Sequence, residues 1–201
     1  MQVAQHSIHI IGAGIGGLTL GRCLLKYGIP TVLYEKVPGS SRHGYGITLH
    51  ASSYRPLLDV LGLDEKILGG VSPWMVEPTS FRAHREKLEQ LLRECLEVQW
   101  EHALEKVKHT ASENVIGPGG GRQLQSAFVV GTDGPHSSTR KSPFSDTHFK
   151  VLPYVAFDGK RRISRARFDE VYAPAMGNSA IIETRVGDAT LNVSVNDQQD
   201  R

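Results

Sequence analysis

The sequence is poor in cysteine and in aromatic residues, with two cysteines among 201 residues and an aromatic content of 7%. Cys23 and Cys95 fall in expected helices and lack metal-ligand spacing, which argues against a zinc site or a disulfide framework. Buried free thiols in the reducing cytoplasm are the simplest interpretation. No stretch approaches the roughly 20 consecutive apolar residues that span a bilayer, so we expect no membrane segment. The sequence also leaves little room before Gly12 for a targeting peptide.

An excess of charge of either sign is absent as well, because 23 Lys and Arg residues stand against 21 Asp and Glu residues. A basic cluster at residues 160–162, followed by Arg165 and Arg167, lacks the interleaved aromatic side chains that stack on nucleic-acid bases. We therefore interpret the cluster as solvated surface and expect no nucleic-acid partner. Neither a Ser-His-Asp order nor paired carboxylates point to a hydrolase.

What the sequence does contain is a glycine motif between an apolar run and a helical run. Gly12, Gly14 and Gly17 form G-x-G-x-x-G between residues 8–11 and residues 18–26. In such a motif the first glycine permits a tight turn, the second lets the backbone approach a diphosphate, and the third lets the helix pack on the strand. The N–H groups and the positive dipole end at the helix start would then bind the diphosphate.

Glu35 adds a third feature in the right order. It ends the apolar run of residues 31–34 and lies 18 residues beyond Gly17. A ribose-binding carboxylate is expected about 20 residues beyond the glycine motif. Together these features predict a βαβ dinucleotide-binding unit. The alternative is a glycine-rich loop with an unrelated surface glutamate.

A second motif follows residues 126–130, which we expect to form a buried strand. Asp133 and Gly134 predict a sharp turn, and Ser137 and Arg140 follow on the next turn of chain. Aspartate can accept hydrogen bonds from ribose hydroxyls, while serine and arginine can donate to phosphate. The alternative is an ordinary Asp-Gly turn before an exposed helix start.

Residues 131–140 match the D-G-x-x-S-x-x-R motif of the group A flavin-dependent monooxygenases, the aromatic hydroxylase superfamily. Residues 44–49 resemble that family's glycine strand, where the backbone at Gly46 would touch FAD. Arg85 stands in an R-x-x-L helix start, and the resemblance implies contact with the FAD phosphates. Residues 153–168 are similar to the start of the family's substrate domain. The amino-acid sequence of several of these segments resembles that of fungal oxidoreductases of secondary metabolism.

The resemblance implies an α/β fold with a Rossmann-like FAD-binding domain over residues 1–150 and the beginning of a mixed, β-rich substrate domain over 151–201. It implies FAD as cofactor, NAD(P)H as reductant, and O2-dependent hydroxylation or epoxidation of an aromatic or alkene small molecule. No side chain is assigned as a catalytic acid or base, and no metal site is expected. The implied cofactor-binding residues are Gly12, Gly14, Gly17, Glu35, Gly46, Arg85, Asp133, Gly134, Ser137 and Arg140.

The sequence departs from the family pattern at three places, one of which is the connection from Leu68 to Phe81, which is shorter than the family's. Thr132 stands where the family's motif has alanine. Gly187 and Asp188 precede a strand pattern, so we interpret them as a hairpin turn and expect the family's later G-D segment to be absent. The alternative function is therefore a truncated, non-catalytic flavoprotein remnant that binds nucleotide weakly or not at all. An unfinished sheet edge could then pair with another chain. A plain NAD-linked dehydrogenase is disfavoured by the Asp133 motif.

Periodicity predicts the remaining elements. We expect a helix that is capped by Ser52 or Ser53 and ends at Gly62. The apolar stripe of residues 83–95 predicts a second helix. Further expected strands lie at residues 151–157, 180–185 and 190–195, and a small antiparallel ribbon is expected from residues 98–100 and 103–109.

Overall fold

The computed structural model divides the chain into two compact units. One unit comprises Met1–Gly44 and Arg85–His148, and the other comprises Tyr45–His84 and Phe149–Arg201. The expected boundary near Lys150 lies beside the division at Phe149, whereas residues 45–84 group with the C-terminal segment. The described residues are 7–39, 45–64, 79–109, 114–118, 124–126, 128–144, 146, 150–177, 179 and 181–194.

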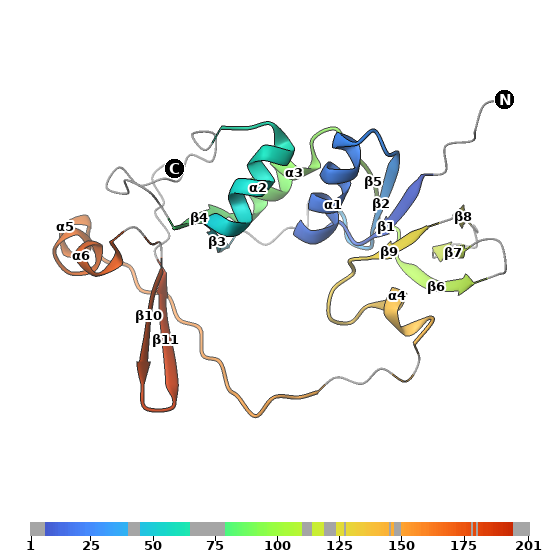
Figure 1. The fold of residues 1–201 in the computed structure, drawn as a ribbon. Coiled ribbons are helices and arrows are strands. Elements are labelled where there is room, and N and C mark those ends of the chain that lie inside the picture. The colour runs from blue at the N-terminus through green and yellow to red at the C-terminus, as the bar shows by residue number, and fades with distance from the viewer. Residues whose placement is uncertain are drawn as a thin grey trace. The chain divides into compact units, whose positions relative to one another are not determined.

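A four-stranded parallel sheet forms the centre of the first unit (Figure 1). Its strands are β1 (Ile8–Ile11), β2 (Thr31–Glu35), β5 (Glu97–Trp100) and β9 (Val129–Gly131), in the order β5-β2-β1-β9. Helix α1 (Ile15–Lys26) connects β1 to β2, which confirms the predicted strand–helix–strand unit and the α/β fold class. The glycine motif therefore lies at the carboxyl end of β1, where ligands of such sheets bind.

Alternating side chains on the strands give this sheet two buried faces. Ile10 and Leu33 are fully buried, and Leu33 lies on the face that α1 covers, 3.3 Å from where a Cβ on Gly21 would stand. On the other face, Ile11 and Tyr34 are buried and pack against Val32, Leu104 and Val129. Each fully buried aliphatic side chain contributes about 1.5–3 kcal/mol, so this sheet is the core that holds the glycine motif in place.

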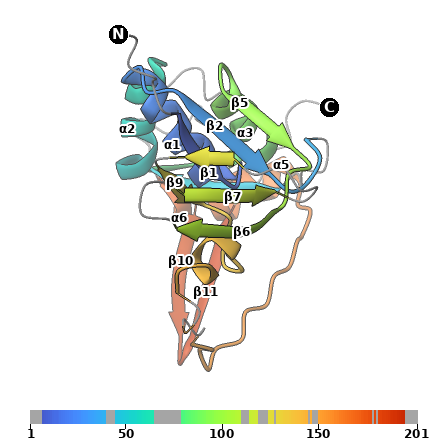
Figure 2. The ribbon, with the colours of Figure 1, turned by 90° about the vertical axis from the view of Figure 1, so that its right-hand side faces the viewer.

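The rest of the first unit adds a second helix and a second sheet. Helix α3 (Arg85–Arg93) packs against α1 and buries Leu88 and Leu92. A separate antiparallel sheet has the order β6 (Leu104–His109), β7 (Asn114–Pro118) and β8 (Leu124–Ser126), and Figure 2 shows β6 and β7 running in opposite directions. The short helix α4 (Ser138–Lys141) follows β9.

The second unit contains two antiparallel strand pairs. Strands β3 (Gly46–His50) and β4 (Ser80–His84) form one pair, and helix α2 (Ala51–Leu61) follows β3. Strands β10 (Ile181–Val186) and β11 (Ala189–Ser194) form the other, with Gly187 at a φ of 59° between them. This confirms the predicted hairpin turn at Gly187 and Asp188. The helical segments α5 (Arg165–Arg167), η2 (Phe168–Tyr172, a π-helix) and α6 (Ala173–Met176) precede the hairpin.

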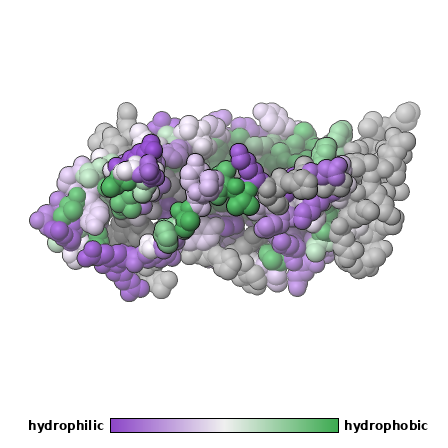
Figure 3. Space-filling view, turned by 90° about the horizontal axis from the view of Figure 1, so that it is seen from below, coloured by the Kyte–Doolittle hydropathy of each residue, from purple (hydrophilic) through white to green (hydrophobic). Residues whose placement is uncertain are grey.

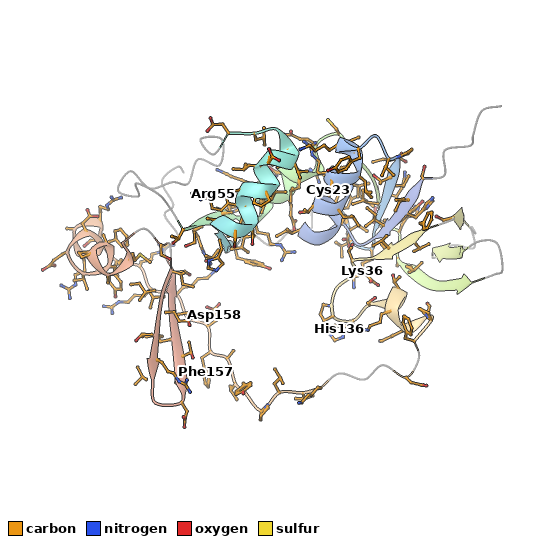
Figure 4. All side chains as sticks on the ribbon, in the orientation of Figure 1. Cys23, Lys36, Arg55, His136, Phe157 and Asp158 are labelled. Carbon is orange, nitrogen blue, oxygen red and sulfur yellow. The ribbon has the colours of Figure 1, made fainter. Side chains whose placement is uncertain are left out.

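The predicted helix over residues 83–95 was too long at both ends. Ala83 and His84 belong to β4, where they pair with Ile47 and Gly46. The helix ends at Arg93, and Cys95 follows in the left-handed region at a φ of 62°. Cys95 is exposed, so the expectation of a buried thiol was wrong there, whereas Cys23 is partly buried on α1 (Figure 4).

Other local predictions failed because they ignored distant partners. Residues 98–100 belong to the parallel sheet beside β2, not to a ribbon with β6. The expected strand over residues 126–130 is divided between β8 and β9, which lie in different sheets. Helix α2 begins at Ala51 without a side-chain capping bond, so the predicted serine cap was wrong, although Gly62 ends the helix at a φ of 67° as expected.

The predicted strand over residues 151–157 was also wrong. This segment has no regular secondary structure, and Val151, Tyr154 and Phe157 are 88%, 81% and 94% exposed. Figure 4 shows Phe157 and Asp158 on this extended segment, and Figure 3 shows that apolar and polar patches alternate on the face drawn there. Among the helices of the described ranges, none has the length and apolar character needed to cross a membrane.

Candidate functional site

The first and third glycines of the motif are required by the fold itself. Gly12 has a φ of 102°, and a Cβ there would stand 2.6 Å from the carbonyl oxygen of Thr132. A Cβ on Gly17 would collide with the carbonyl oxygen of Gly12 and would lie 2.6 Å from Thr132 Oγ1. Any larger side chain would therefore push α1 away from β1 or from the turn at Thr132.

Gly14 differs from these two glycines. Its φ of −75° and ψ of −178° are available to any residue, and no protein atom lies within 4 Å of where its Cβ would stand. Gly14 is also the N-cap of the 12-residue helix α1, and its cap has no side-chain hydrogen bond. The protein's own packing therefore does not explain a glycine here, but a ligand that approaches the backbone at the helix start does.

Glu35 lies against the glycine motif. Its carboxylate is at the end of β2 and is 8% exposed. Oε2 accepts a hydrogen bond from the N–H of Ala13 at 2.9 Å, and Oε1 accepts one from the N–H of Val37 at 3.2 Å. An ionised carboxylate accepts hydrogen bonds only, which suits backbone N–H groups and ribose hydroxyls alike. The structure thus brings four of the predicted residues together: Gly12, Gly14, Gly17 and Glu35.

Thr132 joins the two sequence motifs, which sequence reasoning did not foresee. Its N–H donates to the carbonyl oxygen of Ile11 at 2.7 Å. Its hydroxyl lies within donating distance of the carbonyl oxygens of Ile11 (2.9 Å) and Gly12 (2.7 Å). The residue that departs from the family pattern therefore fastens the Asp133 turn onto the glycine turn, although the two are separated by about 120 residues.

The residues of the second motif hydrogen-bond to one another. Asp133 Oδ1 accepts from the Ser137 hydroxyl at 2.6 Å, and Oδ2 accepts from the backbone N–H groups of Ser138 (2.7 Å) and Thr139 (3.2 Å). The Ser137 hydroxyl in turn accepts from the N–H of Arg140 at 2.9 Å. The spacing of the motif is thus the spacing of a capped helix start.

Charge and backbone conformation agree with this arrangement. Burial acts to raise the pKa of Asp133, but the hydrogen bonds from Ser137, Thr139 and Ser138 outweigh it and lower the pKa below its usual value. Gly134 adopts a φ of 82°, and Arg140 Nη2 donates to the carbonyl oxygen of Pro135 at 2.7 Å. His136 lies exposed on the same loop (Figure 4). An ionised carboxylate and a structured turn therefore stand directly after Thr132.

The last two predicted residues lie on α3 and β3. Arg85 is the first residue of α3, and its Nε donates to Oε1 of Glu89 at 2.9 Å. Gly46 belongs to the second unit, where it is buried and begins β3 opposite His84.

Two features near the site were missed by the sequence analysis. Glu89 is buried together with Leu88 and Leu92 on α3. The sequence indicated this only by an acidic residue among the apolar residues of the helix. The guanidinium of Arg93 lies over the Trp100 ring at 5.4 Å. This pair borders a small pocket whose other lining residues are Leu18, Gly39, Glu86, Glu89 and Gln90. Within the described ranges, no group of three or more acidic, histidine or cysteine side chains could hold a metal ion.

Comparisons with known proteins agree with this geometry. Residues 5–95 match the family model described as an FAD binding domain. The chain is 27% identical to the FAD-dependent monooxygenase vrtH of Penicillium aethiopicum, over 94% of this chain and 54% of that protein. It is 28% identical to the FAD-dependent monooxygenase nscC of Neosartorya fischeri, over 90% of this chain and 53% of that protein. The chain thus spans about half the length of the curated relatives it matches.

Solved structures show the same fold. A protein of Photorhabdus luminescens described as a proposed FAD-containing monooxygenase is 26% identical, with a TM-score of 0.58 over 70% of this chain and 43% of that one. The tetracycline destructase Tet(51) is 22% identical, with a TM-score of 0.60 over 69% of this chain and 41% of that one. The chain therefore resembles the amino-terminal half of fungal FAD-dependent monooxygenases, and its residues 5–95 are similar to an FAD binding domain.

Proposed function

We propose that this chain binds FAD and provides the FAD-binding part of a monooxygenase. The observation that carries the proposal is the open space beside Gly14 at the uncapped start of α1, next to the buried carboxylate of Glu35. A dinucleotide needs this combination, because its diphosphate binds helix N–H groups and its ribose binds a carboxylate. The names of the fungal relatives favour this function over a non-catalytic remnant.

Each predicted residue has a distinct task in this proposal. The backbone from Gly12 to Gly17 would bind the diphosphate together with Arg85, and Glu35 would accept hydrogen bonds from the adenosine ribose. The backbone of Gly46 would contact the cofactor. Asp133, Gly134, Ser137 and Arg140 would contribute through the turn that they build.

The bound FAD would supply the redox chemistry, while the protein supplies position and electrostatics. By likeness to the relatives, we propose NAD(P)H as the reductant and O2 as the co-substrate. The substrate would be an aromatic or alkene small molecule, and the pathway a fungal secondary-metabolite pathway.

Two glycine variants test the binding proposal. A Cβ at Gly14 and a Cβ at Gly16 would both meet no protein atom within 4 Å, so both variants should fold. Gly14→Val would place its side chain where the diphosphate must approach, and should abolish FAD binding in a fluorescence titration. Gly16→Ala adds only a methyl group and keeps the backbone N–H groups, so it serves as the control and should retain binding. Equal FAD affinity in the parent and in folded Gly14→Val would contradict the proposal.

A second experiment tests the proposed reaction. The FAD-loaded chain is mixed with NADPH under anaerobic conditions, and reduction is followed by the loss of flavin absorbance. Oxygen and candidate phenols or alkenes are then added, and oxygenated products are sought by mass spectrometry. FAD that binds but is never reduced by NADPH or NADH would contradict the nicotinamide assignment and leave the binding proposal standing.

A further inference from the structure

Helix α3 begins with a charge arrangement that helix stability does not explain. Arg85 is its first residue, where the positive end of the helix dipole disfavours a cation. Arg85 pairs with Glu89 at Nε–Oε1 2.9 Å. In helical pairs four residues apart, the favourable order is acid first and base second, and here the order is reversed. The pair opposes both local preferences, which points to a role outside helix formation.

The two partners differ in exposure. The side chain of Glu89 is 6% exposed and lies on the buried stripe of α3, whereas the side chain of Arg85 is 28% exposed. Packing holds the carboxylate in place, and the ion pair offsets the cost of burying its charge. Glu89 is therefore the more firmly held partner of the pair, and Arg85 is the more exposed one.

We propose that Glu89 is a positioning residue that holds the Arg85 guanidinium ready for the FAD diphosphate. The inference rests on the proposed function. A bond through Nε orients the guanidinium plane, whose terminal amino groups match phosphate oxygens in a planar fork. Because the long side chain is ordered before FAD arrives, less rotamer freedom is lost on binding.

The direction in which Glu89→Gln changes the affinity for FAD distinguishes a positioning role from a general electrostatic effect. Glu89 carries a negative charge near an anion site, so charge alone predicts that Glu89→Gln tightens FAD binding. Positioning predicts that the same change weakens it. Glu86 is the matched control, because it lies on the first turn of α3 and borders the same pocket as Glu89. Glu86→Gln removes the same charge and leaves the Arg85–Glu89 pair intact.

The test is a flavin-fluorescence titration of the full chain with FAD at constant ionic strength. Glu89→Gln should raise the Kd for FAD about 2- to 10-fold, the range expected for one side chain that must be ordered on binding. Glu86→Gln should leave the Kd unchanged or lower it. In an Arg85→Ala background, Glu89→Gln should have no further effect. Riboflavin, which has no diphosphate, should not distinguish the parent from Glu89→Gln.

Circular dichroism melts establish that each variant is folded. If Glu89→Gln fails to fold, Glu89→Asp replaces it, since the shorter carboxylate keeps the charge and reaches Arg85 less well. An unchanged or lower Kd in the folded variant would overturn the inference. So would an equal loss of affinity in the parent and Arg85→Ala backgrounds, which would mark Glu89 as merely structural. A parent chain that does not bind FAD at all would instead overturn the proposed function, and the inference with it.

Discussion

At the scale of single residues, Glu35 has one observed task and one proposed task, and the two can be separated. Its carboxylate accepts the N–H of Ala13, a backbone group inside the glycine motif. It is also the residue predicted to accept the ribose hydroxyls of FAD. The first task concerns the stability of the empty site, and the second concerns affinity for the cofactor.

Glu35→Ala should therefore lower both quantities. Loss of charge-assisted hydrogen bonds to the ribose should weaken FAD binding by about 1.5–3 kcal/mol, as measured by flavin titration. The Tm should fall as well, because the Ala13 N–H loses its acceptor. Glu35→Gln, which keeps the shape and one acceptor oxygen, should show a smaller fall in Tm. Unchanged FAD affinity in folded Glu35→Ala would show that the ribose assignment is wrong.

The sequence predicted the site residues that a short motif marks. It missed those whose role depends on contacts in the folded chain. Gly12, Gly17 and Glu35 follow a known spacing along the chain, and the structure brings them together around one turn. The hydroxyl of Thr132 reaches carbonyl groups about 120 residues away, and no sequence pattern encodes such a bond. Glu89 had a weak signal only, a carboxylate on an apolar stripe.

At the scale of elements, Thr132 connects the end of β9 to the end of β1. Thr132→Ala removes a partly buried hydroxyl bond and should lower the free energy of unfolding by about 0.5–1.5 kcal/mol in urea titrations. The fold should persist, because the flavin-dependent monooxygenase motif that residues 131–140 resemble has alanine at this position. Thr132→Ser keeps the hydroxyl and should retain most of the stability. Equal losses in the two variants would mean that the methyl group, and not the hydroxyl, matters.

The face of the sheet opposite α1 carries a partly buried histidine. His9 on β1 stacks on Tyr34, with 3.1 Å between Nδ1 and the Tyr34 hydroxyl. Burial lowers the pKa of His9 below its ordinary 6.5, and the Glu97 carboxylate opposes this shift. Burial and Glu97 both raise the pKa of Tyr34. The folded protein therefore favours neutral imidazole.

This shift predicts how stability depends on pH. Between the lowered pKa and 6.5 the unfolded chain binds the His9 proton more readily than the folded chain, so folding is favoured as pH rises. The contribution is complete above pH 6.5 and is lost as the pH falls below it. Unfolding titrations at pH 5.5 and 7.5 should show a smaller pH difference in His9→Gln than in the parent. Identical differences in the two proteins would contradict the assignment to His9.

Element boundaries could be predicted only where neighbouring residues decide them. The turn at Gly187 and the end of α2 at Gly62 both need a positive φ, and glycine marks both. The start of α3 could not be predicted, because Ala83 fits the apolar stripe of a helix. In the structure Ala83 lies in β4 and pairs with Ile47 of β3. Pairing of this kind depends on the other strand, which the local pattern does not contain.

At the scale of the whole molecule, two compact units are made from interleaved segments. Residues 45–84 are enclosed in sequence by the first unit but group with the second. Composition changes near Lys150, which is why a boundary was expected there. No comparable change in composition marks residues 45 and 84. A prediction that treats each domain as one continuous segment therefore could not separate residues 45–84.

The segment of residues 150–164 should be the first site of proteolysis. Its residues are exposed and have no regular secondary structure, and it includes Lys160, Arg161 and Arg162. Trypsin needs an extended, accessible backbone, so brief digestion followed by mass spectrometry should find the first cuts there. Arg185 is also exposed but lies in β10, where strand pairing protects the backbone. Cleavage at Arg185 before residues 160–162 would contradict this expectation.

The position of β1 in the sheet has a consequence for the order of folding. One neighbour of β1 is β2, which follows within about 20 residues, and the other is β9, which is made much later. While the chain leaves the ribosome, β1 is an open sheet edge, and the carbonyl groups of Ile11 and Gly12 lack Thr132 as a donor. The glycine turn is therefore completed late, by a long loop closure, although its glycines are among the first residues synthesised.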